Sequence, residues 1–147
     1  MSSDLQWLLL RNNNAFIVKR VEEGPIFSKE PGNLTNLHSF KYSGLANSKT
    51  IDVQQTPSGI QIATAKKGAS PHAVSPAKVI TTIRNRSGPR RAAGVAAKLA
   101  KRGYRPDLRQ AAIARVSALA ATQKEKKPSP PKKLRGKKAL AIAAALD

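Results

Sequence analysis

The sequence contains no cysteine and few acidic residues, and both shortages exclude whole classes of protein. Its 147 residues include 27 lysines and arginines against 8 aspartates and glutamates, which gives a formal net charge of +19 at pH 7. Without cysteine there is no disulfide framework, no zinc site built on thiolates and no thiol nucleophile. So large a positive excess repels itself in a compact chain, which indicates a polyanionic partner. Nucleic acid is the first candidate, and an anionic membrane surface is the second.

Long hydrophobic runs and targeting signals are also missing. The longest apolar run, Ala139–Leu146, is too short to cross a bilayer as a helix. Asp4 lies where a secretory signal peptide would carry basic residues, so we expect no such peptide. The helix expected at residues 89–102 has an apolar face made mostly of alanine, which favours burial in lipid only weakly. These features favour a nucleic acid over a membrane as the partner.

Residues suited to catalysis or metal binding are scarce. His38 and His72 have no further metal ligands at a suitable spacing, and surface positions explain them better. The adjacent glutamates at 22–23 precede a Gly-Pro turn, whereas general acid–base catalysis needs carboxylates that converge from different elements. The dipeptide at 136–137 lacks the upstream glycine of a phosphate-binding loop. We expect a protein that is not an enzyme and uses no cofactor, metal ion or small-molecule substrate.

Charge and aromatic residues divide the chain into unlike halves. Residues 1–76 carry 8 basic and 5 acidic side chains, a net +3, and residues 77–147 carry 19 and 3, a net +16. Of the aromatic residues, only Tyr104 lies in the second half. Since large aromatic side chains suit a small core, this division predicts a core in the first half and a binding unit in the second.

Hydrophobic periodicity predicts an α+β fold in three parts. Residues 1–83 are expected to form a β-rich globular part, residues 84–123 an arginine-rich helical part suited to bind nucleic acid, and residues 124–147 a basic, largely disordered tail. The tail combines many lysines with three prolines and little apolar surface before its alanine-rich end, which is typical of a segment that does not fold alone.

The globular part is expected to combine a short N-terminal helix at residues 4–10 with a small antiparallel β-sheet. Apolar and polar residues alternate there, as in strands that bury one face. The turn-forming sequence at 56–59 predicts a hairpin. The expected strands cover residues 15–21, 37–42, 50–54, 60–66 and 79–83.

The helical part is expected to contain two basic amphipathic helices. The first begins at Pro89 and ends before Gly103, in keeping with the preference of proline for helix starts and glycine for helix ends. The second begins at Pro106, where Asp107 complements the helix dipole. The expected apolar faces contain Ala92, Val95, Ala96 and Leu99 in the first helix and Leu108, Ala112, Val116 and Leu119 in the second.

Arginine is concentrated where these helices are expected, since eight of the 11 arginines lie between residues 84 and 115. A guanidinium group offers a planar fork that binds phosphate through two hydrogen bonds, whereas a lysine acts as a point charge. We therefore expect positioned phosphate contacts from the helices and diffuse attraction from the tail. The expected RNA-binding residues are Arg84, Arg86, Arg90, Arg91, Lys98, Lys101, Arg102, Arg105, Arg109, Arg115, Lys132 and Lys133.

The corner before Pro106 gives the sharpest expectation for RNA binding. Arg102, Arg105 and Arg109 would surround one bend of RNA backbone, because the residue before proline is held extended. The alternative is a plain helix–helix turn whose arginines point into water. Replacement of Arg105 or Arg109 by alanine is expected to leave the fold intact.

Several separated motifs also resemble a known family. The chain contains, in order, Leu5-Gln6-Trp7, Phe16-Ile17-Val18-Lys19-Arg20, Glu30-Pro31-Gly32-Asn33-Leu34 and Tyr104-Arg105-Pro106-Asp107-Leu108-Arg109-Gln110. Spread over residues 3–124, they resemble the eukaryotic large-subunit ribosomal proteins of the L-twenty-eight-e family. Residues 125–147 lie outside this resemblance.

The resemblance implies a non-catalytic structural component of the large (60S) subunit of the cytoplasmic ribosome, assembled in the nucleolus. Such a protein would bind ribosomal RNA and neighbouring ribosomal proteins through a small α+β domain and RNA-contacting helices. A ribosome-assembly factor with a related domain is one alternative, and a chromatin protein with a tail like that of a linker histone is another. The short length and the absence of an acidic tail favour the ribosomal component.

Overall fold

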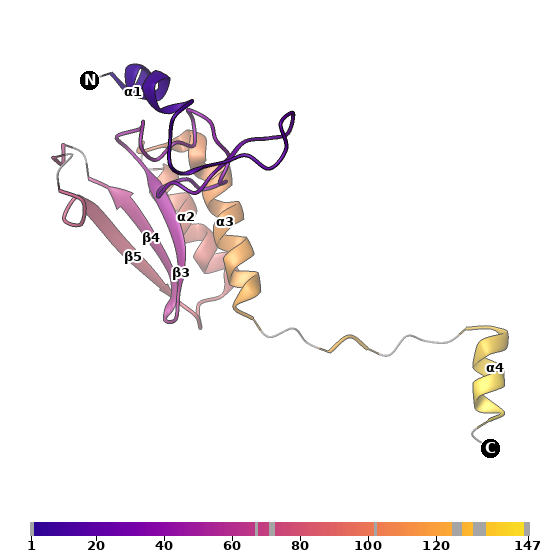
Figure 1. Ribbon diagram of the computed structural model, residues 1–147. Coiled ribbons are helices and arrows are strands. Elements are labelled where there is room, and N and C mark those ends of the chain that lie inside the picture. The colour runs from indigo at the N-terminus through magenta and orange to yellow at the C-terminus, as the bar shows by residue number, and fades with distance from the viewer. Residues whose placement is uncertain are drawn as a thin grey trace.

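Helices and antiparallel strands combine in an α+β arrangement (Figure 1), in agreement with the expected fold class. The structure, a computed structural model, describes residues 2–145 apart from 67, 71–72, 102, 125–127 and 131–134. The elements in chain order are α1 (Ser3–Leu10), β1 (Ile17–Val18), β2 (Phe27–Ser28), β3 (Ile51–Thr56), β4 (Gly59–Ala65), β5 (Lys78–Arg84), α2 (Pro89–Lys101), a 3₁₀ turn (Pro106–Leu108), α3 (Arg109–Thr122) and α4 (Lys137–Ala143).

The larger sheet has the strand order β3-β4-β5, and both neighbouring pairs are antiparallel. The two-residue loop Pro57-Ser58 joins β3 to β4, which confirms the expected hairpin. Gly59 then begins β4 with a φ of +142°, and a side chain at this position would collide with the carbonyl of Ile83 on β5. The close approach of β5 therefore requires a glycine here.

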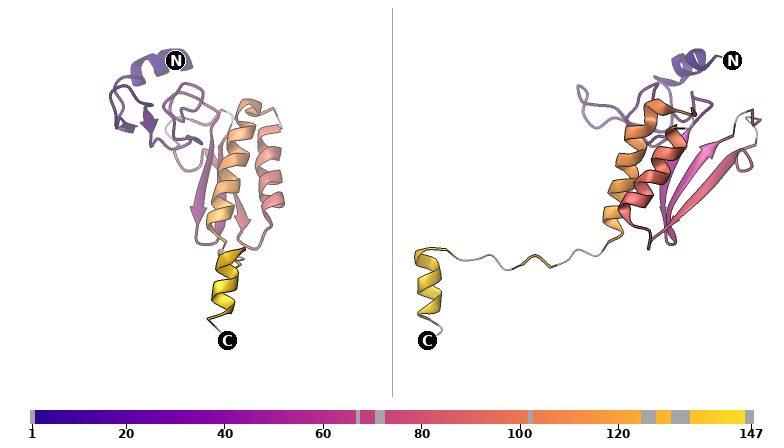
Figure 2. Two further views of the ribbon diagram at one scale, coloured as in Figure 1. Left: turned by 90° about the vertical axis from the view of Figure 1, so that its right-hand side faces the viewer. Right: turned by 180° about the vertical axis from the view of Figure 1, so that it is seen from behind.

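Helices α2 and α3 cover one face of this sheet, and the core lies between the two layers (Figures 1 and 2). Alternate residues of each strand point to the same face, so the aliphatic ones meet the helices. The helices contribute residues spaced four apart, which lie on one side of a helix. The buried core residues are Leu34, Ile51, Val53, Ile60, Ile62, Ile83, Ala92, Ala96, Ala100, Leu108, Ala112, Val116 and Ala120.

The expectation of a core confined to the first half of the chain is wrong. Phe16, Phe27 and Phe40 are between 36% and 40% exposed, whereas alanines of α2 and α3 are buried. The physical reason is that a three-stranded sheet needs a covering layer to bury its apolar face, and α2 and α3 provide it. Small alanine side chains let these helices pack closely, so the core needs few aromatic rings.

Two of the expected strands are short or absent. The strand expected at 15–21 is reduced to β1, which pairs with β2 in a separate two-stranded sheet. Residues 37–42 make turns instead of a strand, apart from one bridge between Leu37 and Phe27. The backbone N–H of Ser43 donates to the carbonyl of Ser39 (2.9 Å), and this local bond bends the chain away from an extended path.

A buried polar cluster holds residues 28–46 in this irregular path. Glu30 is 4% exposed, and its carboxylate oxygens accept hydrogen bonds from Asn33 Nδ2 (3.1 Å) and Ser43 Oγ (3.0 Å). Asn33 Nδ2 also donates to the carbonyl of Leu37 (2.9 Å). Because buried polar groups are stable only when they are hydrogen-bonded, these side chains fix the conformation of the segment.

We expect the alanine contact between α2 and α3 to tolerate no larger side chain. Ala112 is fully buried, so Ala112→Leu should force the helices apart and lower the free energy of unfolding by about 1–3 kcal/mol. Ala118 lies exposed on the same helix, and Ala118→Leu should change stability by less than about 0.5 kcal/mol. Urea unfolding of the two full-length variants measures the difference, and equal effects would contradict the close packing described above.

Candidate nucleic-acid interface

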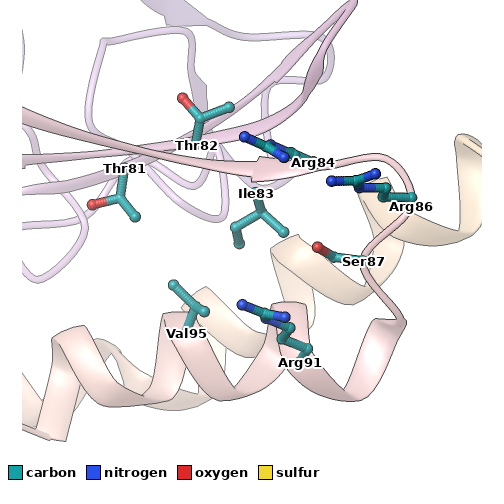
Figure 3. A pocket seen from close by; sticks show the side chains of 8 residues that line it. All are labelled: Thr81, Thr82, Ile83, Arg84, Arg86, Ser87, Arg91 and Val95. Carbon is teal, nitrogen blue, oxygen red and sulfur yellow. The ribbon is translucent and has the colours of Figure 1, made fainter.

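Three arginines surround a groove between β5 and α2 (Figure 3). Arg84 ends β5, Arg86 lies in the connecting turn, and Arg91 lies in the first turn of α2. The groove has a volume of about 280 Å³, and Ile83 and Val95 face each other across it. Its remaining lining residues are Thr81, Thr82 and Ser87.

The local sequence explains how these arginines come together. Along β5, Ile83 points into the core, so the next residue, Arg84, points out. The turn after β5 is held by a hydrogen bond from the backbone N–H of Ser87 to the carbonyl of Arg84 (2.9 Å). Pro89 then begins α2 at the position that proline favours. A strand end, a tight turn and a helix start thus bring arginines onto the rim of one groove.

The positive charge of the groove is not neutralised within the part of the chain that the structure describes. Arg84, Arg86 and Arg91 are exposed, and no described carboxylate lies within ion-pair distance of them. An anion that entered the groove would therefore meet guanidinium groups that are free to bind it. Phosphate suits such groups best, because its oxygens match the geometry of the guanidinium fork.

Comparisons with known proteins assign the chain to a family. Residues 5–122 match the model of the Ribosomal L28e protein family. The chain belongs to this family. It is similar to the large ribosomal subunit protein eL28 of Schizosaccharomyces pombe, with 37% identity over 131 residues that cover 86% of this chain and 96% of the relative.

Two further relatives carry the same name. The eL28 of Dictyostelium discoideum is 36% identical over 79% of this chain and 84% of its own length. The eL28 of Caenorhabditis elegans is 40% identical over 56% of this chain and 61% of its own length. The family match ends at residue 122, where α3 also ends. The tail therefore lies outside the family's common region, as the motifs indicated.

The other basic residues expected to bind RNA are dispersed in this family member. Arg90, Lys98 and Arg109 are exposed on the helices. Arg115 is half-buried on α3, and its Nε has no hydrogen-bond partner among the described residues. Lys101 ends α2, but its side chain is not among the described parts of the structure, and Arg102, Lys132 and Lys133 lie outside the described residues. Their contacts with RNA stay predictions.

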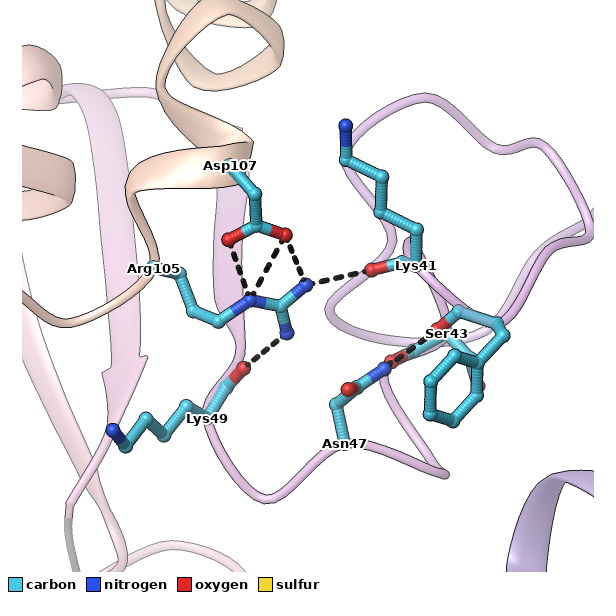
Figure 4. Close-up of polar contacts among 7 residues, drawn as sticks. Lys41, Ser43, Asn47, Lys49, Arg105 and Asp107 are labelled. Atoms are coloured by element: carbon cyan, nitrogen blue, oxygen red, sulfur yellow. Dashed lines mark hydrogen bonds and ion pairs between the residues drawn. The ribbon is translucent and has the colours of Figure 1, made fainter. Parts of the chain in front are cut away.

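Arg105 has a structural role that sequence patterns did not reveal (Figure 4). Its Nε and one terminal nitrogen donate to the carboxylate of Asp107, with a shortest distance of 2.7 Å. The terminal nitrogens also donate to the backbone carbonyls of Lys49 (3.0 Å) and Lys41 (2.8 Å). Each guanidinium nitrogen thus has a protein partner, and the side chain joins the start of the 3₁₀ turn to the loop before β3.

These contacts do not fit the expected clasp of Arg102, Arg105 and Arg109 around RNA. Arg102 lies outside the described residues, and the Arg105 side chain is only 15% exposed. The contacts also argue against the expectation that Arg105→Ala leaves the fold intact, because the substitution would remove bonds between two distant segments. The spacing of Arg105 and Asp107 on either side of a proline is the one sequence signal that could have indicated this contact.

Tyr104 adds a second contact next to Arg105. Its hydroxyl lies within hydrogen-bond distance of the carbonyls of Thr50 (3.2 Å) and Ala65 (2.7 Å), beside β3 and at the end of β4. Burial raises the pKa of Tyr104, so the hydroxyl stays protonated and remains a donor. Tyr104 and Arg105 together fasten the turn between α2 and α3 to the sheet and the preceding loop.

The described residues form neither a candidate metal site nor a helix that could span a membrane. No group of three or more histidine or acidic side chains comes together there in a way that could hold a metal ion. None of the described helices has both the length and the apolar character needed to cross a bilayer.

We expect Arg105 to contribute to stability through its contacts with Asp107, Lys41 and Lys49. Arg105→Ala should lower the free energy of unfolding by about 1–3 kcal/mol, because it leaves partly buried carbonyls without their donors. Arg109→Ala, which removes the same charge from an exposed position, should change it by less than about 0.5 kcal/mol. Thermal unfolding of both variants tests this, and equal stability would show that the Arg105 contacts contribute nothing.

The Arg105–Asp107 pair should also make stability depend on pH. The hydrogen bonds from Arg105 hold the pKa of Asp107 below its ordinary value of 3.8. A carboxylate whose pKa is lower in the folded than in the unfolded protein stabilises the fold at pH values above its unfolded-state pKa. This stabilisation is lost as the pH falls through its folded-state pKa. Asp107→Asn should therefore be less stable than the wild type at neutral pH, and the difference should shrink below pH 3.8. A difference that stays constant across a urea-unfolding series from pH 7 to strongly acidic pH would contradict this assignment.

Proposed function

We propose that this chain is a non-catalytic structural component of the large (60S) ribosomal subunit that binds ribosomal RNA through the groove between β5 and α2. One observation carries the proposal. Arg84, Arg86 and Arg91 gather around a single groove, with no described carboxylate beside them, in a member of a ribosomal protein family.

The chemistry of the groove suits an RNA backbone. Three guanidinium groups supply the charge and the paired donors that phosphates bind. Hydroxyl groups of Thr81 and Ser87 add neutral donors and acceptors, which suit ribose hydroxyls. Ile83 and Val95 line the groove from β5 and α2, so the arginines approach the backbone from regular elements.

The remaining basic residues extend this surface in the proposal. Arg90, Lys98 and Arg109 on the helices would contact neighbouring phosphates, and lysines of the tail, including Lys132 and Lys133, would add diffuse attraction. Arg115, which is half-buried on α3, would contribute its positive charge to this surface. The net charge of +16 on residues 77–147 requires partners of this kind.

Family membership favours the ribosome over the chromatin alternative. The relatives are named as proteins of the large ribosomal subunit, and we assign the same assembly to this chain, in the cytoplasm after assembly in the nucleolus. Its nearly neutral first half, with Leu5, Leu8 and Leu9 exposed on α1, would face neighbouring ribosomal proteins rather than RNA.

We expect the groove arginines to govern incorporation into large subunits. In cells that express tagged wild-type and variant copies together, Arg86→Ala/Arg91→Ala should be incorporated at least several-fold less than the wild type. In binding to a large-subunit RNA fragment, the slope of log affinity against log salt should fall by about 2, because two phosphate contacts are lost. Both residues are exposed, so the fold should remain.

The matched control removes the same charge elsewhere. Arg11→Ala/Arg20→Ala takes two exposed arginines from the first half of the chain. It should leave incorporation and the salt slope close to those of the wild type. If both double variants lose incorporation equally, total charge rather than the groove governs binding, and the proposal fails.

A further inference from the structure

The outer side of β5 is an open sheet edge within the described part of the chain. β5 pairs with β4 alone, and no described segment pairs with its other side. The backbone N–H of Lys66 donates to the carbonyl of Ala77 (2.8 Å). Because hydrogen-bonded pairs alternate along an antiparallel ladder, residues 79, 81 and 83 bond to β4. Ile80 and Thr82 therefore turn both their N–H and their C=O groups away from the sheet.

This edge lacks the features that usually prevent a further strand from pairing. Residues 79–83 contain no proline and no charged side chain, and the register with β4 runs from Lys78 to Arg84 without a bulge. Val79 and Ile80, which point to opposite faces of the sheet, are 46% and 59% exposed. A regular, uncharged, aliphatic edge is the kind of surface to which an extended chain adds.

The backbone pattern of the edge favours a polypeptide over RNA as its occupant. Ile80 and Thr82 present N–H donors and C=O acceptors in alternation, and an extended peptide supplies the matching acceptors and donors at the spacing of a β-ladder. Phosphate oxygens accept hydrogen bonds but donate none, so RNA would leave both carbonyls facing negative charge. No charged side chain lies between Lys78 and Arg84, so the edge itself gives a phosphate backbone no ionic partner.

Neither the tail of this chain nor a second copy of the protein suits the edge of β5. The tail contains Pro128, Pro130 and Pro131 close together, and proline has no N–H to donate to a ladder. A second copy would bring another net charge of +19 against the first. Lys78 and Arg84 at the two ends of the edge favour a segment that carries no positive charge of its own.

We propose that the edge of β5 at Ile80 and Thr82 accepts an extended, aliphatic segment of a neighbouring ribosomal protein, with no net positive charge, as a fourth strand of the sheet. This inference rests on the proposed place of the chain in the large subunit, but not on RNA binding by the groove arginines. The added strand would exchange backbone hydrogen bonds with Ile80 and Thr82 and would cover the side chains of Val79 and Ile80 on the two faces.

Amide hydrogen exchange tests the proposal without any substitution. In the free full-length protein, the amides of Ile80 and Thr82 should exchange much faster than those of Val79, Thr81 and Ile83. In purified large subunits, the Ile80 and Thr82 amides should slow by on the order of 10- to 100-fold, as expected for two added hydrogen bonds. Unchanged exchange of both amides in the subunit would overturn the proposal.

Crosslinking then identifies the occupant. A photoreactive side chain in place of Ile80, which does not line the arginine groove, should join in purified subunits to one short segment of one other ribosomal protein. Joining to ribosomal RNA alone, or to a second copy of this chain, would overturn the proposal even if the amides are slowed.

A proline substitution separates this edge from RNA binding. Ile80→Pro removes an N–H that β4 does not use, so the sheet should remain intact, whereas the edge can no longer donate at that position. We expect several-fold lower incorporation than for Ile80→Val, which keeps the N–H and the aliphatic side chain, with unchanged affinity for the large-subunit RNA fragment and an unchanged salt slope. Equal incorporation of the two variants would overturn the proposal, whereas an unchanged salt slope for the groove variants would instead overturn the proposed function. If Ile80→Pro does not fold, exchange and crosslinking decide the matter.

Discussion

The alanine-lined contact between α2 and α3 is the constraint on which the rest of the structure depends. Ala92, Ala96 and Ala100 on one helix, with Ala112 and Ala120 on the other, allow a close pair of helices that covers the sheet. The apolar residues of the two helices lie on the sides that face each other and the sheet, so the outer sides can carry arginine. A conventional contact with large side chains would hold the helices further apart and change the distance between α2 and β5, where the groove lies.

The basic side chains contribute little to holding the fold together. Apart from the Arg105–Asp107 pair, the described basic side chains have no ionic partner within the described part of the protein. Exposed pairs of that kind would contribute little to stability, whereas unpaired arginines keep their full capacity for an external anion. The protein therefore holds itself together with small apolar contacts and buried hydrogen bonds, and its positive charge remains available for an anionic partner.

In the segment before β3, polar side chains take over the role that regular secondary structure has in the rest of the fold. Glu30, Asn33 and Ser43 fix a loop in which the backbone follows no repeating pattern. Arg105 and Tyr104 then connect the helical part to that loop and to the sheet. Such contacts are specific in direction, so they position irregular segments that apolar packing alone would leave loosely defined. Two of the motifs that resemble the family contain Glu30 and Asn33, and Tyr104 and Arg105. These motifs therefore have a structural role in addition to any role in binding.

The sequence by itself determined the elements whose signal is local. The start of α2 at Pro89, the hairpin at Pro57-Ser58 and the strand β5 all follow from proline, glycine and β-branched residues that act on their own backbone. It also determined the family and the excess of positive charge. The path of residues 37–42 could not be derived, because the bond between Glu30 and Ser43 joins residues on either side of this segment and overrides the alternating pattern.

Only the tertiary structure decided which arginines face solvent and which bond to the protein. Arg84, Arg86 and Arg91 line one groove between β5 and α2. Arg105 carries the same side chain and lies in the same arginine-rich stretch, but it turns inward to Asp107 and two backbone carbonyls. A count of charges treats these residues alike, since charge is a property of each residue alone. Whether a guanidinium group faces solvent or protein depends on which acceptors the fold brings within a few ångströms of it, and that is settled by contacts between segments far apart in the chain.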